Sequence, residues 1–231
     1  MQNPLLRDLD GLMCQILQLA ARVEEVICKA IRALRDQCPE LAEEVIRDDD
    51  AIDRFEVRIE EDCLRILALH QPVAIDLRRV ATVLKINNDL ERMADLAVNI
   101  AERAACLARE ARQTPIPASL EPMTALTIQM VRGSLDAFVN SDAQAARLVC
   151  AQDEQVDAYN RQIIEDIKRL MQRRPESLDA GLHLFSACRH LERIADHATN
   201  IAEDVVFLKE GDIIRHHLPS QPRAALLTHP T

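Results

Sequence analysis

Four pairs of acidic residues, each with a spacing of four, are the features of this sequence best suited to chemistry. They are Asp49 with Asp53, Glu91 with Asp95, Asp153 with Asp157, and Glu192 with Asp196. Residues four apart on a helix lie about 40° apart around its axis, so both carboxylates of a pair project to the same side. Like charges in this arrangement cost roughly a few tenths of a kcal/mol on an exposed helix. A bound cation would offset that repulsion.

The acidic pairs recur because the chain repeats itself. The segment LERMADLAVNIAE, which starts at Leu90, matches LERIADHATNIAE, which starts at Leu191, at ten of thirteen places and an offset of 101 residues. The segment DDAIDRFEVRIEEDCLRIL from Asp49 aligns with DEQVDAYNRQIIEDIKRLM from Asp153 at an offset of 104 residues. Two matches at nearly the same offset predict a tandem duplication.

The composition favours an all-α fold, because the chain has only four glycines and 2% aromatic residues and is rich in strong helix formers. Helical spacing of apolar residues predicts six long helices, at about 5–36, 39–69, 73–111, 120–140, 143–171 and 178–210. Prolines 39, 72 and 175 mark three of the breaks between them.

Helices of this length joined by short breaks must fold back on their neighbours. We therefore expect two antiparallel three-helix bundles, formed by residues 1–112 and 120–217. Residues 113–119, with two prolines, are expected to be a linker, and residues 218–231 a poorly ordered tail.

The two acidic pairs of each copy are predicted to meet. Asp53 lies 18 residues before Gln71 and Glu91 lies 20 after it, so the two reach one height in a hairpin that rises about 1.5 Å per residue. Asp157 and Glu192 lie 18 residues before and 17 after Pro175. Clustered carboxylates suit hard cations such as iron, manganese, magnesium or calcium. Acidic faces that are merely solvated, or paired with arginines, remain the alternative at this stage.

Charge and motif content argue against several other functions. The formal net charge is −10 and there is no long basic block, which argues against nucleic-acid binding. No apolar run approaches the roughly 20 residues of a membrane span, and the N-terminus lacks the pattern of a secretory leader. Seven widely spaced cysteines without a C-x-x-C pair fit a reducing compartment, so a cytoplasmic protein is expected. Neither a glycine-rich phosphate loop nor a nucleophile with its base is recognisable.

Three stretches carry a resemblance to a known family. The sequence QPVAIDLRRVATVLKINNDLERMADLAVNIAE, its echo RHLERIADHATNIAE and the closing FLKEGDIIRHH closely resemble the PhoU family of phosphate-uptake regulators, over about Leu12 to His217. The resemblance implies two similar three-helix bundles, a homodimer, and multinuclear metal clusters on the bundle surface. The metal would be iron in particular, with manganese, magnesium, zinc or calcium as alternatives. Carried over by position, the ligands are Asp49, Asp53, Glu91 and Asp95 in the first copy and Asp153, Asp157, Glu192 and Asp196 in the second.

The resemblance also implies a non-enzymatic role. The expected protein is an accessory of the phosphate ABC transporter that contacts the transporter's ATPase component and the sensor histidine kinase of the phosphate regulon. It would not span the membrane, although peripheral association is left open. Asn160 stands where the first copy has Glu56, which leaves the nuclearity of the second cluster open. A metal-dependent phosphoester hydrolase and a structural helical adaptor without metal are the two alternatives.

Overall fold

The computed structural model describes residues 4–109 and 114–214, which form seven α-helices and one short 3₁₀ helix. The helices are α1 (Pro4–Asp36), α2 (Pro39–His70), α3 (Ala74–Ala108), α4 (Leu120–Asn140), α5 (Ala143–Cys150), α6 (Asp153–Arg173) and α7 (Leu178–Glu210), with η1 (Pro175–Ser177) before α7. The described residues contain no strand, which confirms the all-α prediction. None of their helices is long and apolar enough to cross a membrane.

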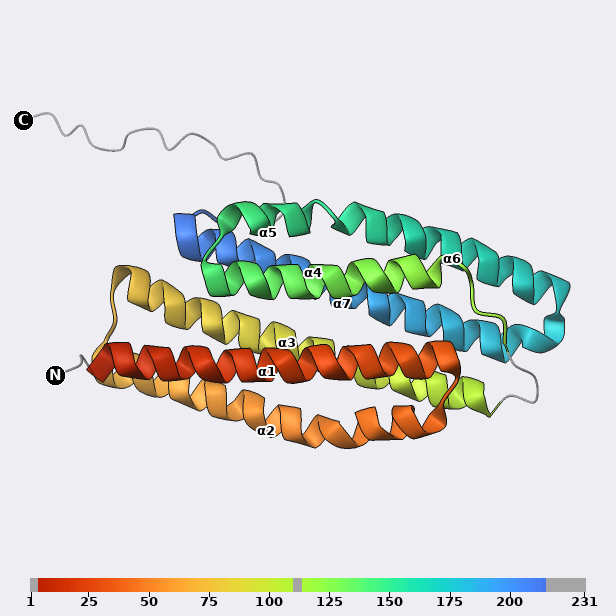
Figure 1. Ribbon diagram of the computed structural model, residues 1–231, viewed down its shortest axis with the longest axis horizontal. Helices are drawn as coiled ribbons and strands as arrows, with labels where there is room; N and C mark the ends of the chain where they lie inside the picture. The colour runs from red at the N-terminus through yellow and green to blue at the C-terminus, as the bar shows by residue number, and fades with distance from the viewer. Residues whose placement is uncertain (1–3, 110–113, 215–231) are drawn as a thin grey trace, which may run out of the picture.

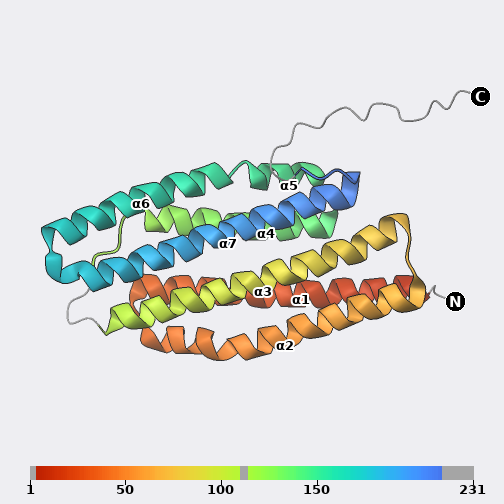
Figure 2. The same ribbon diagram turned by 180° about the vertical axis from the view of Figure 1, so that it is seen from behind.

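The helices form two antiparallel bundles that lie side by side. Helices α1, α2 and α3 make one bundle, and α4 with α5, α6 and α7 makes the other, as Figure 1 shows. The two bundles join chiefly where α3 packs against α7, and these two helices run in opposite directions. Figure 2 shows the face on which α3 and α7 lie in front, whereas α1 and α4 lie in front in Figure 1. The contact of α3 with α7, here called the seam, is therefore central to the molecule.

Apolar side chains at helical spacing fill both bundles and the seam. On α3 the fully buried residues include Ile86, Met93, Ala97 and Ile100, the face that lies opposite the acidic pairs. Burying side chains of this size contributes about 1.5–3 kcal/mol each. The amphipathic pattern thus determines which face of each helix is buried and places the carboxylates on the opposite face.

Most helix ends fall where the sequence predicts them. Pro39 begins α2 in its first turn, and Gln71 ends that helix in the left-handed conformation with φ 45°. Gly211 ends α7 with φ 80°, the conformation that glycine adopts at least cost. These breaks align the hairpins in the register that brings the acidic pairs to one height.

Some predicted boundaries differ from those of the structure, and others fall outside the described residues. The expected continuous helix at 143–171 is wrong, because the chain turns at Ala151 and Gln152 and makes two helices, α5 and α6. Helix α3 ends at Ala108 rather than near 111, and residues 110–113 lie outside the described residues. The predicted tail at 218–231 also lies outside them. Of the predicted linker, Thr114 is held by Gln37, whose Nε2 donates to its carbonyl oxygen at 2.8 Å.

Candidate metal centres

The first set of predicted ligands comes together between α2 and α3. Burial, followed by the negative charges of Asp53 and Asp95, raises the pKa of Asp49 to about 6. Burial and then the charge of Asp95 raise the pKa of Glu91, and Asp53 raises it further. Charge effects of this kind act between neighbouring groups. Asp49, Asp53, Glu91 and Asp95, here called the first quartet, therefore form one acidic cluster.

The second set comes together between α6 and α7 in the same way. Burial, then the charges of Glu192, Asp153 and Asp157, raises the pKa of Asp196 to about 6, even though the residue as a whole is exposed. Burial raises the pKa of Glu192, and Asp157 and Asp153 act in the same direction. Asp153, Asp157, Glu192 and Asp196 are called the second quartet. The duplication in the sequence thus appears as two similar clusters in space.

Each quartet contains a buried oxygen that lacks a hydrogen-bond partner among the described residues. In the first quartet it is Asp49 Oδ1, and in the second it is Glu192 Oε2. An unsatisfied buried acceptor costs about 1–3 kcal/mol, and more when the group is charged. A cation bound at each quartet would satisfy its buried oxygen and relieve the repulsion between its carboxylates. The residues present therefore fit the expected metal ions.

Arginine side chains meanwhile draw some of the carboxylates outward. Arg92 lies 3.4 Å from a carboxylate oxygen of Glu91 and 3.4 Å from one of Asp95. Arg189 Nη1 donates to Glu192 Oε1 at 2.7 Å. Among residues 4–109 and 114–214, no three His, Cys, Asp or Glu side chains surround one point closely enough to coordinate an ion as they stand. Coordination of an ion would therefore require the carboxylates to change their side-chain positions.

The two centres differ at one position near the ligands. In the first, Asn87 Nδ2 donates to Glu56 Oε1 at 2.8 Å, and Asp53 is among the charges that raise the pKa of Glu56. In the second, the equivalent residue is Asn160, which is only 3% exposed and whose Oδ1 has no hydrogen-bond partner among the described residues. The first centre thus has a fifth carboxyl group at hand, and the second has a neutral amide.

The turn between α5 and α6 opens a hollow beside the second quartet. The hollow measures about 680 Å³, and its lining includes Asp153, Asp157, Thr199 and Glu203. The sequence did not predict the hollow, because neither glycine nor proline marks the turn that forms it. The available signal is the acidic pair Asp153-Glu154, since acidic residues favour the first turn of a helix.

A second polar region, which the sequence analysis missed, lies in the seam. His197 Nδ1 donates to Asp89 Oδ1 at 2.8 Å, and Lys85 Nζ donates to Asp204 Oδ1 at 3.0 Å. Asn200 also donates to Asp89 Oδ1, at 3.4 Å, so its amide faces the seam. Each pair joins residues more than a hundred positions apart, so spacing within one helix could not reveal it.

Comparisons with known proteins agree with this architecture. The PhoU domain model matches twice, at residues 16–104 and 120–205. The phosphate-specific transport system accessory protein PhoU homolog of Aquifex aeolicus is 42% identical over 212 residues, which are 92% of this chain and 96% of that protein. The crystal structure of PhoU from Pseudomonas aeruginosa superposes with a TM-score of 0.86 at 35% identity, and covers 89% of this chain and 99% of that one. The phosphate transport system regulatory protein PhoU from Streptococcus pneumoniae gives a TM-score of 0.84 at 33% identity, with 90% and 98% covered.

Proposed function

The chain belongs to the PhoU family, and on that premise we propose that it is a regulator of phosphate uptake that carries two metal centres. The relatives from Aquifex aeolicus and Pseudomonas aeruginosa are both named accessory proteins of a phosphate-specific transport system. The observation that carries the metal centres is the duplicated quartet, since each copy gathers four carboxyl groups around a buried oxygen without a partner.

In this proposal the eight quartet carboxylates hold hard cations, with iron first and manganese, magnesium, zinc or calcium as alternatives. Bound metal supplies positive charge that neutralises the quartets. Helices α2, α3, α6 and α7 carry both quartets, so metal loading changes the charge of the surface that these helices present (Figure 2). A change of this kind alters which protein surfaces can dock, because like charges opposed at an interface cost several kcal/mol.

The partners that we propose are the ATPase component of the phosphate ABC transporter and the sensor histidine kinase of the phosphate regulon. The protein acts as a homodimer in the cytoplasm, associates peripherally with these membrane complexes, and restrains both uptake and kinase output when phosphate is ample. The names of the relatives support the link to the transport system. The two named partners and the dimer are part of the proposal.

We also propose that this role involves no catalysis. Burial raises the pKa of Cys63 to about 12 and that of Cys150 to about 11, so these thiols stay protonated at neutral pH and are poor nucleophiles. The competing function is metal-assisted hydrolysis of phosphoesters by the quartets. Metal-loaded protein should turn over none of a panel of phosphoesters. Turnover that disappears in Glu91→Ala would instead establish the hydrolase.

Expression of phosphate-regulon genes in the host tests the regulatory role. Deletion of the gene should derepress phosphate-scavenging genes in high phosphate, and the wild-type gene should restore repression. A variant with Asp53→Asn and Asp157→Asn should fail to restore it, whereas Glu61→Gln, which changes an exposed carboxylate that belongs to neither quartet, should succeed. Unchanged expression after deletion would contradict the regulatory role, and full rescue by the double variant would contradict the role of the metal.

A further inference from the structure

The two halves of the seam are related by the internal repeat but differ in charge. In one half, α3 and α7 supply Asp89 and Asp204, and each carboxylate is paired with a basic residue of the opposite helix. Those basic residues are His197, at 2.8 Å from Asp89, and Lys85, at 3.0 Å from Asp204. This half of the seam therefore supplies its own partners for its acidic groups.

The repeat places residues of opposite character in the other half. At the offset of 101 residues, His190 is the equivalent of Asp89, and Arg103 is the equivalent of Asp204. Ser186 is the equivalent of Lys85, and the equivalent of His197 is Leu96. Both acidic positions have become basic, but neither of the facing positions has become acidic.

Two of the basic side chains in that half each have a buried nitrogen that lacks a hydrogen-bond partner among the described residues. Arg103 Nε and His190 Nδ1 are buried without a hydrogen-bond partner. Arg103 Nη2 reaches only its neighbour Glu102, at 3.0 Å, and His190 Nε2 lies 3.2 Å from Ser186 Oγ. Arg193 is exposed and forms no hydrogen bond or ion pair within the part of the chain that the structure describes. Buried donors normally find partners, so these atoms indicate a missing acceptor.

The repeat places Arg103 opposite Ser186, as Asp204 lies opposite Lys85, and Ser186 contacts His190. Arg193 follows His190 by three residues on α7, so the two side chains are neighbours on that helix. Burial, followed by the positive charges of Arg193 and Arg103, lowers the pKa of His190. Glu102 also acts on His190, in the opposite direction, but its single charge faces two guanidinium groups. The cluster therefore has an excess of positive charge within a protein whose formal net charge is −10.

We propose that this half of the seam is a binding site for inorganic phosphate, formed by Arg103, His190 and Arg193 and not by the metal quartets. Guanidinium groups suit a tetrahedral oxyanion because they offer several donors in a fixed, planar arrangement. Phosphate would accept from Arg103 Nε and His190 Nδ1 and supply the counter-charge that the other half obtains from within the protein. The site depends on the seam alone and stands whether or not the chain regulates phosphate uptake.

Phosphate binding is measured on protein stripped of metal with a chelator and transferred to buffer without phosphate or sulfate. Isothermal titration calorimetry gives the affinity, and the imidazole resonances of ¹⁵N-labelled histidine, assigned with His190→Gln, report the location. We expect saturable binding at one site per chain and a shift of the His190 resonances. Arg103→Gln should weaken binding about tenfold or more, because a hydrogen bond to a charged group is lost. The control Arg92→Gln changes the repeat equivalent of Arg193 and should keep the affinity within about twofold.

Three results would overturn the site. One is the absence of saturable binding to the metal-free protein. Another is binding that appears only after metal is added and is lost in Asp53→Asn but not in Arg103→Gln, which assigns phosphate to the quartets. The last is an equal shift of His190 with chloride at the same ionic strength.

A second variant tests the same site with a protein that should fold well. Ser186→Glu places a carboxylate opposite Arg103, as Lys85 stands opposite Asp204 in the other half. We expect it to abolish phosphate binding and to raise the Tm of the phosphate-free protein, because the internal anion replaces the external one. Wild-type phosphate affinity in Ser186→Glu would contradict the assignment.

Discussion

Replacement of Asp49 by asparagine should stabilise the metal-free protein at neutral and alkaline pH. The pKa of this carboxyl group is raised from 3.8 to about 6 by burial and by the charges of Asp53 and Asp95. A raised acidic pKa means that the ionised form is disfavoured in the folded state. Its penalty is absent well below pH 4, develops as the pH rises from about 4 to 6, and is complete above that range.

The magnitude follows from the difference of about two units between the folded and unfolded pKa values. At about 1.36 kcal/mol per unit, the full penalty is about 3 kcal/mol. Asp49 is half-buried, and solvent screening reduces this value to about 1.5 kcal/mol. Asp49→Asn removes the charge and should raise the free energy of unfolding by that amount at pH 8, with little change at pH 4.

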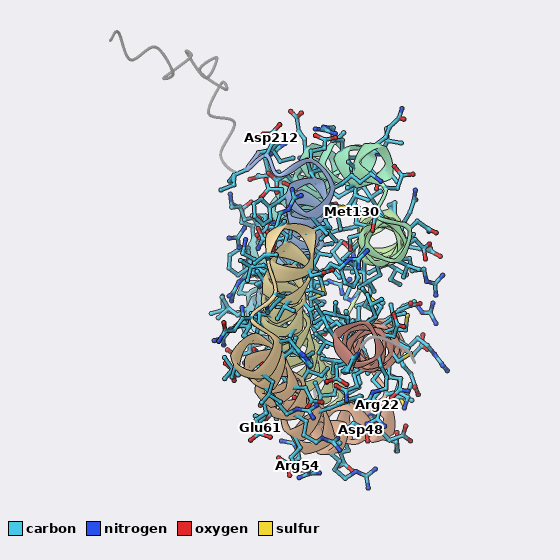
Figure 3. The ribbon with its side chains drawn as sticks, turned by 90° about the vertical axis from the view of Figure 1, so that its left-hand side faces the viewer. Arg22, Asp48, Arg54, Glu61, Met130 and Asp212 are labelled. Carbon is cyan, nitrogen blue, oxygen red and sulfur yellow. The ribbon has the colours of Figure 1, made fainter. Side chains whose placement is uncertain are left out.

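Urea denaturation of chelator-treated protein at both pH values measures the effect. The control is Glu61→Gln on the same helix, an exposed residue outside the quartet that is labelled in Figure 3, which should change the free energy of unfolding by less than about 0.5 kcal/mol. With saturating metal the order should reverse, because the variant lacks one ligand. Destabilisation of the metal-free variant at pH 8, or an equal gain at pH 4 and pH 8, would refute the inference that crowded carboxylates oppose folding at this site.

Three further changes test the elements that position the sites. Gly211→Ala should destabilise the protein by about 1 kcal/mol in urea denaturation, because Gly211 ends α7 with φ 80°. Gly11→Ala should instead stabilise it by up to about 1 kcal/mol, because Gly11 lies within α1 and a Cβ there meets nothing within 4 Å; a stabilised Gly211→Ala or a destabilised Gly11→Ala would contradict the respective prediction. Asp142→Ala should cost about 1 kcal/mol, because Asp142 accepts from two backbone N–H groups at the start of α5, and unchanged stability would show that this cap is dispensable. In thiol-labelling kinetics on native protein, the exposed Cys14 should react first, whereas Cys63, buried and with its pKa raised to about 12, should react only on unfolding; prompt labelling of Cys63 would mean that the first bundle opens readily.

Much of the fold could be predicted because its determinants are local. Pro39 and Gly211 mark helix ends through the backbone conformations that they permit, and apolar spacing identifies the buried faces. The quartets could be predicted to meet because helix rise is constant, so counting residues from a turn gives a height. The division between α5 and α6 could not, since Ala151 and Gln152 are compatible with a helix and the turn is set by tertiary packing.

The seam could not be predicted because its charges act between helices that belong to different copies. Asp89 and His197 are 108 residues apart, and their partnership depends on how α3 crosses α7. The repeat alignment contained a partial signal, since it pairs Asp89 with His190 and Asp204 with Arg103. Opposite charges at equivalent positions of the two copies predict an interaction only when it is known that the two copies contact each other at those positions.

The metal content of protein purified without a histidine tag tests the two metal centres most directly. Elemental analysis should find bound metal, with iron foremost, in the wild-type protein. Glu91→Ala with Asp95→Ala should remove the metal of the first centre, and Glu192→Ala with Asp196→Ala should remove that of the second. Wild-type protein without stoichiometric metal, or metal that is retained when all four residues are replaced, would contradict the proposal that the quartets bind it.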